Sequence, residues 1–205
     1  NWGKVSGIEA LVFSGHRHFF EGQGWTPVAA PIYLLRSFEV RLLVIACPVV
    51  GLNPDYEVGD LTVIADHINM TGENPLVGSH NNIWGNPNPT GADIYDANLL
   101  YHFKECARAK GLKLREGICV GVKGPNFETA AEARAYQCMG ADVICMSMIP
   151  EATLAAAADI RVLGLGSIVA HAASGMASRD EDELRGITEQ LVPQVGDVLK
   201  QFFVD

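Results

Sequence analysis

The sequence contains no uninterrupted apolar run long enough to cross a bilayer, although 48% of its 205 residues are hydrophobic. Its longest apolar stretches, Leu42–Val50 and Val162–Ala173, are typical of buried strands and their flanks. The first residues, Asn1–Lys4, lead into no apolar segment of the kind that a secretory signal requires. We therefore expect no membrane association and no export signal.

Positive charge is also scarce. Lys and Arg total 15 against 24 Asp and Glu, which gives a formal net charge of −9. A surface with this excess of negative charge argues against broad nucleic-acid binding. An anionic substrate would need a local cationic pocket against that background.

The cysteines do not have the spacing of a metal site, and their number does not suit a disulfide framework. They are odd in number and lie in apolar or helical contexts: Cys47, Cys106, Cys119, Cys138 and Cys145. We expect free thiols that mostly fill the core of a cytoplasmic protein, and no bound metal.

No internal repeat or low-complexity linker divides the chain, so we expect one domain over residues 1–205. Short apolar runs alternate with helical patterns, which favours an α/β fold of three layers, a central mixed sheet flanked by helices. The predicted strands are Ala10–Phe13, Leu42–Cys47, Leu61–Ala65, Glu116–Val122, Asp142–Met146 and Arg161–Ser167.

The helical patterns are interrupted by proline at two places. In Thr26–Ser37, Pro27 and Pro31 should confine the helix to its later part, and Pro193 should kink or break the C-terminal helix. The Asn, Gly and Pro content of Thr71–Thr90 predicts a long functional loop. The remaining predicted helices are Ala92–Lys110, closed by Gly111, Thr129–Met139, Ile149–Ala158 and Asp180–Phe203.

Two short segments contain most of the side chains that could bind a ligand. Gly124–Thr129 is a turn that delivers an aromatic ring and a carboxylate together, and Met146–Glu151 is a strand end with a thioether, a hydroxyl and a second carboxylate. A turn and a strand end joined by a helix form a ligand crevice at the carboxyl ends of the strands in an open α/β sheet. A ring beside a carboxylate suits a flat, hydrogen-bonding heterocycle.

These segments, and others in the same order along the chain, resemble the purine nucleoside phosphorylases of the trimeric type, from about Ala10 to the C-terminus. Several multi-residue motifs in one order are far more specific than one short pattern. The matching stretches are GPNFETAAEAR with GAD and MSMIPE, His18–Gly22, Gly51–Pro54, Glu57–Asp60 and Asp66–Asn69.

The resemblance implies a purine site around Glu128. The matching glutamate of the family reads the purine ring, Phe127 would pack on the base, and Ile144 and Met146 would wall the pocket. By position alone, Glu128 could equally complement the dipole of the following helix, and Phe127 and Met146 could be ordinary core residues.

The resemblance also implies a phosphate site. His18 matches a phosphate-contacting histidine, Ser147 a serine that donates to phosphate, and Phe20 a ribose-contacting tyrosine. His16 matches the family's arginine, whereas Arg17 is displaced by one position. On a strand such a shift would turn Arg17 to the opposite face, although His16 or Arg17 could still supply the charge.

Several positions depart from the family pattern. Pro48 stands where a backbone N–H donates to phosphate, and Val50 where glycine admits the ligand. Ala170 replaces an asparagine that hydrogen-bonds the departing purine, with His171 as an adjacent donor. Asn88 replaces a phenylalanine that closes a neighbouring subunit's pocket. Compared with the family, the N-terminal strand and the glycine-rich phosphate loop are missing.

Three functions follow from these features. The first is phosphorolysis of purine nucleosides by a homotrimer, with phosphate as co-substrate and no cofactor. The second is a purine-binding homologue that has lost turnover, which Pro48, Val50 and Ala170 favour. The third is a hydrolase that uses water in place of phosphate, for which only His18 and His171 could serve as the base.

Overall fold

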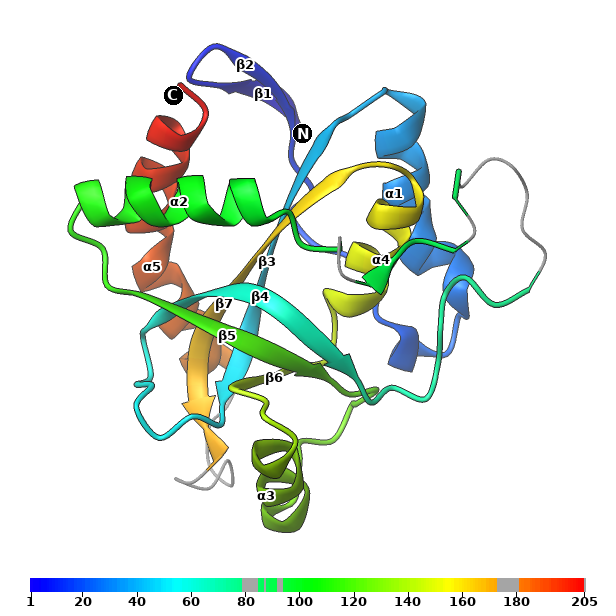
Figure 1. The fold of residues 1–205 in the computed structure, drawn as a ribbon, viewed down its shortest axis with the longest axis vertical. Helices are drawn as coiled ribbons and strands as arrows, with labels where there is room; N and C mark the ends of the chain where they lie inside the picture. The colour runs from blue at the N-terminus through cyan, green and yellow to red at the C-terminus, as the bar shows by residue number, and fades with distance from the viewer. Residues whose placement is uncertain (79–84, 87, 92–93, 173–180, 205) are drawn as a thin grey trace.

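The fold is built around a closed sheet. The computed structural model describes residues 1–78, 85–86, 88–91, 94–172 and 181–204. Within these residues five strands close as a mixed barrel in the order β3-β6-β5-β4-β7, with helices packed around it (Figure 1). This confirms the predicted α/β fold with a central mixed sheet, whereas closure of the sheet was not predicted. The strands are Leu42–Gly51 (β3), Leu61–Asn69 (β4), Leu114–Gly121 (β5), Val143–Cys145 (β6) and Arg161–His171 (β7).

The pairing of β3 explains how the barrel tolerates a proline. β3 runs parallel to β7, with Leu42 opposite Arg161 and Pro48 opposite Ser167. Its other edge pairs with β6 only at Val50 and Gly51 in the described chain. Because the rest of that edge has no strand partner there, Pro48 occupies a strand with an open edge, where a missing N–H is tolerated.

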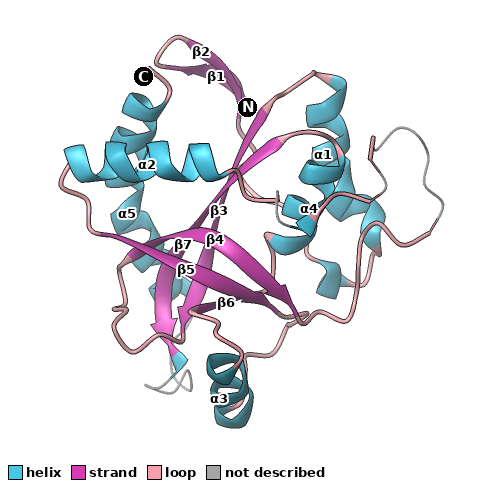
Figure 2. Ribbon diagram, viewed as in Figure 1, coloured by secondary structure: helices cyan, strands magenta, loops and turns pink. Residues whose placement is uncertain are grey.

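Two pairs of helices pack around the barrel, and α3 lies apart from them below β6 (Figure 2). Helices α2 and α5 contact each other on one side, and α1 and α4 contact each other on the other side. None of the described helices is both long and apolar enough to span a membrane. Their bounds are Trp25–Ser37 (α1), Ala97–Ala109 (α2), Ala130–Cys138 (α3), Ile149–Ala157 (α4) and Glu181–Phe202 (α5), with a 3₁₀ turn at Phe19–Glu21 (η1).

The prediction that Pro27 and Pro31 confine α1 to its later part was wrong, and the break predicted at Pro193 is absent from α5, whereas a kink there stays a prediction. Helix α1 starts at Trp25 and continues through Pro27 and Pro31, and α5 continues through Pro193. Pro27 lies in the first turn, where N–H groups have no partner in the helix, so it costs no hydrogen bond. Pro31 removes one such bond, and burial of the face that carries Ile32 offsets this loss.

Other element ends also differ from the predictions. The capping side chain of Asp96 starts α2 at Ala97, and Gly111 follows its end with φ +68°. The expected helix starts at Ala92 and Asp180 lie outside the described residues. Strands β3, β4 and β7 extend beyond the predicted ends because neighbouring strands supply hydrogen-bond partners that local pattern cannot reveal.

The N-terminus forms a separate hairpin. The strand predicted at Ala10–Phe13 is Ile8–Leu11 (β2), and it pairs antiparallel with Trp2–Val5 (β1), outside the barrel (Figure 1). The turn between them has positive φ at Ser6 and Gly7, as tight hairpins require. The Ser6 hydroxyl donates to the carbonyl of Lys200 at 2.7 Å, which ties the hairpin to α5.

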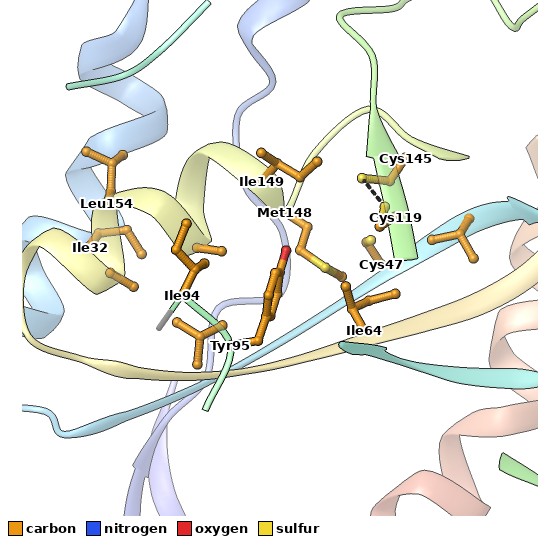
Figure 3. Packing of buried hydrophobic residues seen from close by; sticks show 14 of the residues in the cluster. Ile32, Cys47, Ile64, Ile94, Tyr95, Cys119, Cys145, Met148, Ile149 and Leu154 are labelled. Carbon is orange, nitrogen blue, oxygen red and sulfur yellow. Dashed lines mark hydrogen bonds between the residues drawn. The ribbon is translucent and has the colours of Figure 1, made fainter. Parts of the chain in front are cut away.

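Cysteines fill the main core as predicted. Cys47, Cys119 and Cys145 come from β3, β5 and β6 and converge beside Tyr95 and Met148 (Figure 3). The sulfur atoms of Cys119 and Cys145 lie 3.1 Å apart as a thiol contact. Cys106 is buried too, whereas Cys138 is exposed on α3.

Candidate functional site

The ends of β5 and β6 open into a pocket shared with the N-terminal loop. It contains four predicted site residues, Arg17, His18, Met146 and Ser147, and we refer to it as the strand-end pocket. Its mixture of cationic, aromatic and hydroxyl groups suits an anion attached to an apolar body. The lining is completed by Phe19, Trp25, Val28, Thr71, Val122, Lys123, Pro150 and Glu151.

A glycine holds the Gly124–Thr129 turn against this pocket. Gly124 has φ +70°, and a Cβ there would lie 2.6 Å from the sulfur of Met146 and 3.2 Å from the ring of Phe20. Only glycine combines this backbone conformation with so close an approach. The turn therefore starts against the pocket wall, and Phe127 and Glu128 follow a few residues later.

Glu128 carries a buried carboxylate without a partner. It precedes the N-cap of α3, Thr129, whose hydroxyl accepts from the backbone N–H of Glu132 in a capping box. Glu132, not Glu128, is thus the acidic residue in the first turn of the helix. Both carboxylate oxygens of Glu128 are inaccessible to solvent and have no hydrogen bond. Burial raises the pKa of Glu128 against the opposing effect of the residue's own backbone N–H, and the negative charge of Glu132 adds to the rise. The neighbouring Phe127 is 43% exposed.

The histidine cluster lies on a loop, not on a strand. His18 is the N-cap of η1, and its backbone N–H donates to Glu21 at 2.8 Å. Arg17 donates to the other carboxylate oxygen of Glu21, also at 2.8 Å, and lines the strand-end pocket. Arg17 is therefore not turned to an opposite strand face, as was predicted, because faces alternate only along an extended strand.

The rings of this loop are stacked. The His18 ring lies 4.6 Å from that of Phe20 at 18°, and 4.6 Å from that of His16. Burial lowers the pKa of His18, and His16 lowers it further, against the attraction of Glu151 and Glu21. Burial also lowers the pKa of His16. Both rings are thus held in an environment that favours the neutral form.

Met146 and Ser147 follow the end of β6 and reach the pocket from its floor. Ser147 is 8% exposed, and its carbonyl accepts from the thiol of Cys145 at 2.8 Å. This contact fixes the backbone immediately before α4. The predicted phosphate donor Ser147 and the predicted purine-pocket residue Met146 therefore share one strand end.

Three positions that depart from the family pattern, Pro48, Val50 and Ala170, lie in the C-terminal halves of β3 and β7. Val50 pairs with Ala170 after a bulge, and both pack with Ile144 in one buried cluster. Ile144 and Ala170 are each 2% exposed. The Nε2 of His171 lies 2.9 Å from the carbonyl of Asn53, where a ring N–H donates. The structure thus turns Ala170 inward and His171 toward Asn53.

Three charged or hydroxyl-bearing residues of the pocket were given no binding role from the sequence: Thr71, Lys123 and Glu151. The Lys123 ammonium pairs with Glu73 at 3.0 Å and lies 5.3 Å from the centre of the Phe19 ring. The position of Lys123 directly before the Gly124 turn is the sequence feature that could have identified it as a pocket residue. Among the described residues no group of three or more His, Cys, Asp or Glu side chains could hold a metal.

Sequence comparisons identify a protein family and several relatives of this chain. The profile of the family described as "Phosphorylase superfamily" matches residues 3–203. Purine nucleoside phosphorylase 1 of Bacillus subtilis is 32% identical over 191 residues, which cover 92% of this chain and 70% of the relative. The purine nucleoside phosphorylase of Bos taurus is 36% identical over 172 residues, covering 82% of this chain and 60% of the relative.

Solved structures agree with this fold. Purine nucleoside phosphorylase of Schistosoma mansoni in complex with adenosine superposes with a TM-score of 0.93 and 27% identity. The match covers 98% of this chain and 75% of that one. The same enzyme in complex with inosine gives the same score and identity, with 74% of that chain covered.

Proposed function

Because the chain belongs to the phosphorylase superfamily, within the family of purine nucleoside phosphorylases, we propose that it catalyses phosphorolysis of purine ribonucleosides and deoxyribonucleosides. Inorganic phosphate attacks C1′ of the sugar while the bond from C1′ to the purine nitrogen breaks. The base leaves with the bonding electrons and takes up a proton, which yields free purine and (deoxy)ribose 1-phosphate. The reaction requires no cofactor.

The observation that carries this proposal is the Glu128 carboxylate. A buried charge without a hydrogen bond is costly, and a ligand that offers N–H donors removes that cost. Purines present such donors in the plane of the ring. In this proposal Phe127 packs on the base and Ile144 and Met146 form the walls, while Phe20 contacts the sugar.

Phosphate would bind in the strand-end pocket. His18 and Ser147 offer donors there, and Arg17 supplies a guanidinium with His16 behind it. Such an arrangement attracts an anion locally despite the net charge of −9. Catalysis would then rest on positioning and on electrostatic stabilisation of the leaving base.

A second candidate is a purine-binding homologue with impaired turnover. Pro48 has no N–H for phosphate, and the methyl group of Ala170 cannot donate to the departing base. His171 offers an N–H, which here donates to Asn53. Loss of one transition-state donor costs about 2.7–4 kcal/mol, or roughly 10²–10³ in kcat.

The deciding experiment is cleavage of inosine, guanosine and xanthosine with and without phosphate. The proposed function requires cleavage that depends on phosphate and releases sugar 1-phosphate. Cleavage at the same rate without phosphate identifies a hydrolase. Absence of cleavage with retained binding of hypoxanthine or guanine supports the impaired homologue.

We also propose a homotrimer, which the resemblance to the trimeric type supports. The loop Thr71–Thr90, described only in part, would reach a neighbouring subunit, and Asn88 is exposed within it. Light scattering at micromolar concentration should give three times the chain mass of 22.1 kDa. A monomer mass would contradict the proposal.

A further inference from the structure

His16 and Glu151 lie next to each other near the proposed phosphate donors, and each has a buried polar atom without a hydrogen bond. Glu151, in the first turn of α4, is 8% exposed, and its Oε2 is buried without a hydrogen bond. The Nε2 of His16 is also buried without a hydrogen bond and lies 3.7 Å from Oε1 of Glu151. Among buried side-chain polar atoms of the described residues, those without a partner belong only to Glu128 and to this pair.

Glu151 lines the strand-end pocket together with His18 and Ser147. A carboxylate is an unfavourable neighbour for a phosphate dianion, because like charges repel more strongly in a site shielded from water. Its presence therefore needs a reason. A proton taken up by the pair would remove the negative charge and supply a donor in its place.

The pair is suited to change its protonation. Burial raises the pKa of Glu151 and lowers that of His16, so both groups resist becoming charged. An incoming anion favours an added proton nearby, which reinforces the raised pKa of Glu151 and opposes the lowered pKa of His16. The other titratable or charged groups that face the pair, or that line a cavity with one of its members, are Glu9, Arg17, His18, Glu21, Arg41, Cys47 and Lys123.

We propose that the His16–Glu151 pair takes up one proton when phosphate enters the strand-end pocket. This makes Glu151 a positioning residue whose protonation sets the affinity for the anion. The location of the phosphate rests on the proposed function, whereas the proton coupling does not follow from it. Linkage then requires the affinity to fall by up to about tenfold per pH unit once the free pair has lost the proton.

Sulfate is the appropriate probe, because it keeps two charges throughout the neutral pH range and brings no titration of its own. Calorimetry in two buffers of different ionisation enthalpy counts the protons taken up with the anion. We expect about one proton per sulfate near pH 8 from full linkage. The dissociation constant should rise with pH between pH 7 and 8.5.

Glu151→Gln tests the pair directly. The variant removes the negative charge and keeps the shape, so proton uptake should fall toward zero and the pH dependence should flatten. Sulfate should bind the variant more tightly than the original chain at pH 8.5, a gain that structural damage would not produce. Glu105→Gln, which removes an exposed carboxylate paired with Arg108 on α2, is the control. It should change neither the proton uptake nor the affinity for sulfate.

The outcomes separate this inference from the proposed function. Sulfate binding without proton uptake, or unchanged uptake in Glu151→Gln, overturns the inference and leaves phosphorolysis untouched. Nucleoside cleavage that does not depend on phosphate overturns the proposed function, while proton uptake with sulfate would still support the pair. His16→Asn provides a second variant, in which uptake should also fall.

Discussion

Replacement of Glu128 by glutamine should stabilise the empty protein and weaken purine binding at the same time. The carboxylate is buried with both oxygens unpartnered, so the empty structure bears an uncompensated charge. A neutral amide of the same shape removes most of that cost. We estimate a gain of about 1 kcal/mol in unfolding free energy, from the usual cost of an unsatisfied buried group. For a chain of this size the gain raises Tm by about 2–4 °C.

The size of this effect depends on pH. The folded-state pKa of Glu128 is raised by burial, so the folded state holds its proton more tightly than the unfolded state does. The cost of the charge is therefore absent below the unfolded pKa of about 4.3 and complete above the folded pKa. The gain in Tm from Glu128→Gln should grow as pH rises from 4 toward neutrality.

Purine binding should respond in the opposite direction. Hydrogen bonds to a charged acceptor contribute about 1.5–3 kcal/mol, so the variant should bind hypoxanthine or guanine roughly 10- to 100-fold more weakly. Calorimetry measures this affinity, and thermal unfolding by circular dichroism measures Tm. Both measurements use the same preparations without phosphate.

Glu132→Gln is the matched control. Glu132 lies four residues further on and accepts from the backbone N–H of Thr129 at 2.7 Å in the capping box. Its replacement should lower stability by about 0.5–1 kcal/mol and leave base affinity unchanged. The reasoning fails if Glu128→Gln lowers Tm as Glu132→Gln does, or if it binds purine as tightly as the original chain.

Three further predictions concern other parts of the chain. Gly124→Ala should lower stability by about 1–3 kcal/mol in urea unfolding, clearly more than Gly111→Ala, which shares a positive φ but has open space around it. Asp60→Asn should cost about 2–3 kcal/mol at pH 7, because Asp60 is buried and accepts from Arg115 at 2.7 Å. Burial acts to raise the pKa of Asp60, but its hydrogen bonds hold it below the ordinary value, so this difference should shrink in acid as the carboxylate is protonated. An equal cost at pH 3 and pH 7 would contradict that account. Ala170→Asn should raise kcat for inosine phosphorolysis more than it changes KM, and an unchanged kcat would show that this position offers nothing to the departing base.

Local pattern predicted most of the elements. Strand β5 and helix α3 lie close to their predicted bounds, because apolar runs, Thr129 as a cap and glycine at helix ends act over a few residues. The helix through Pro27 and Pro31 was missed because proline was weighed without the burial that offsets it. Closure of the barrel was missed because β4 pairs with β7 across about a hundred residues of sequence.

The sequence likewise predicted some residues of the candidate site and missed others. The motif around Glu128 could be identified from sequence because its residues are consecutive, and the resemblance gave it a role that remains a prediction. Lys123 and Thr71 were not assigned to the pocket, and Glu151 was given no role in it, since nothing local shows which loops meet at a strand end. The orientation of Arg17 was misjudged because the segment was treated as a strand.

The sequence by itself determined the alternation of strands and helices, the order of the motifs and the family to which they belong, because these depend on residues close together in the chain. The tertiary structure alone decided which side chains lost their water without gaining a partner. The burial of Glu128 and the approach of His16 to Glu151 depend on segments far apart in sequence. Desolvation depends on how the whole chain packs, so its effect on these carboxylates could be identified only from the folded structure.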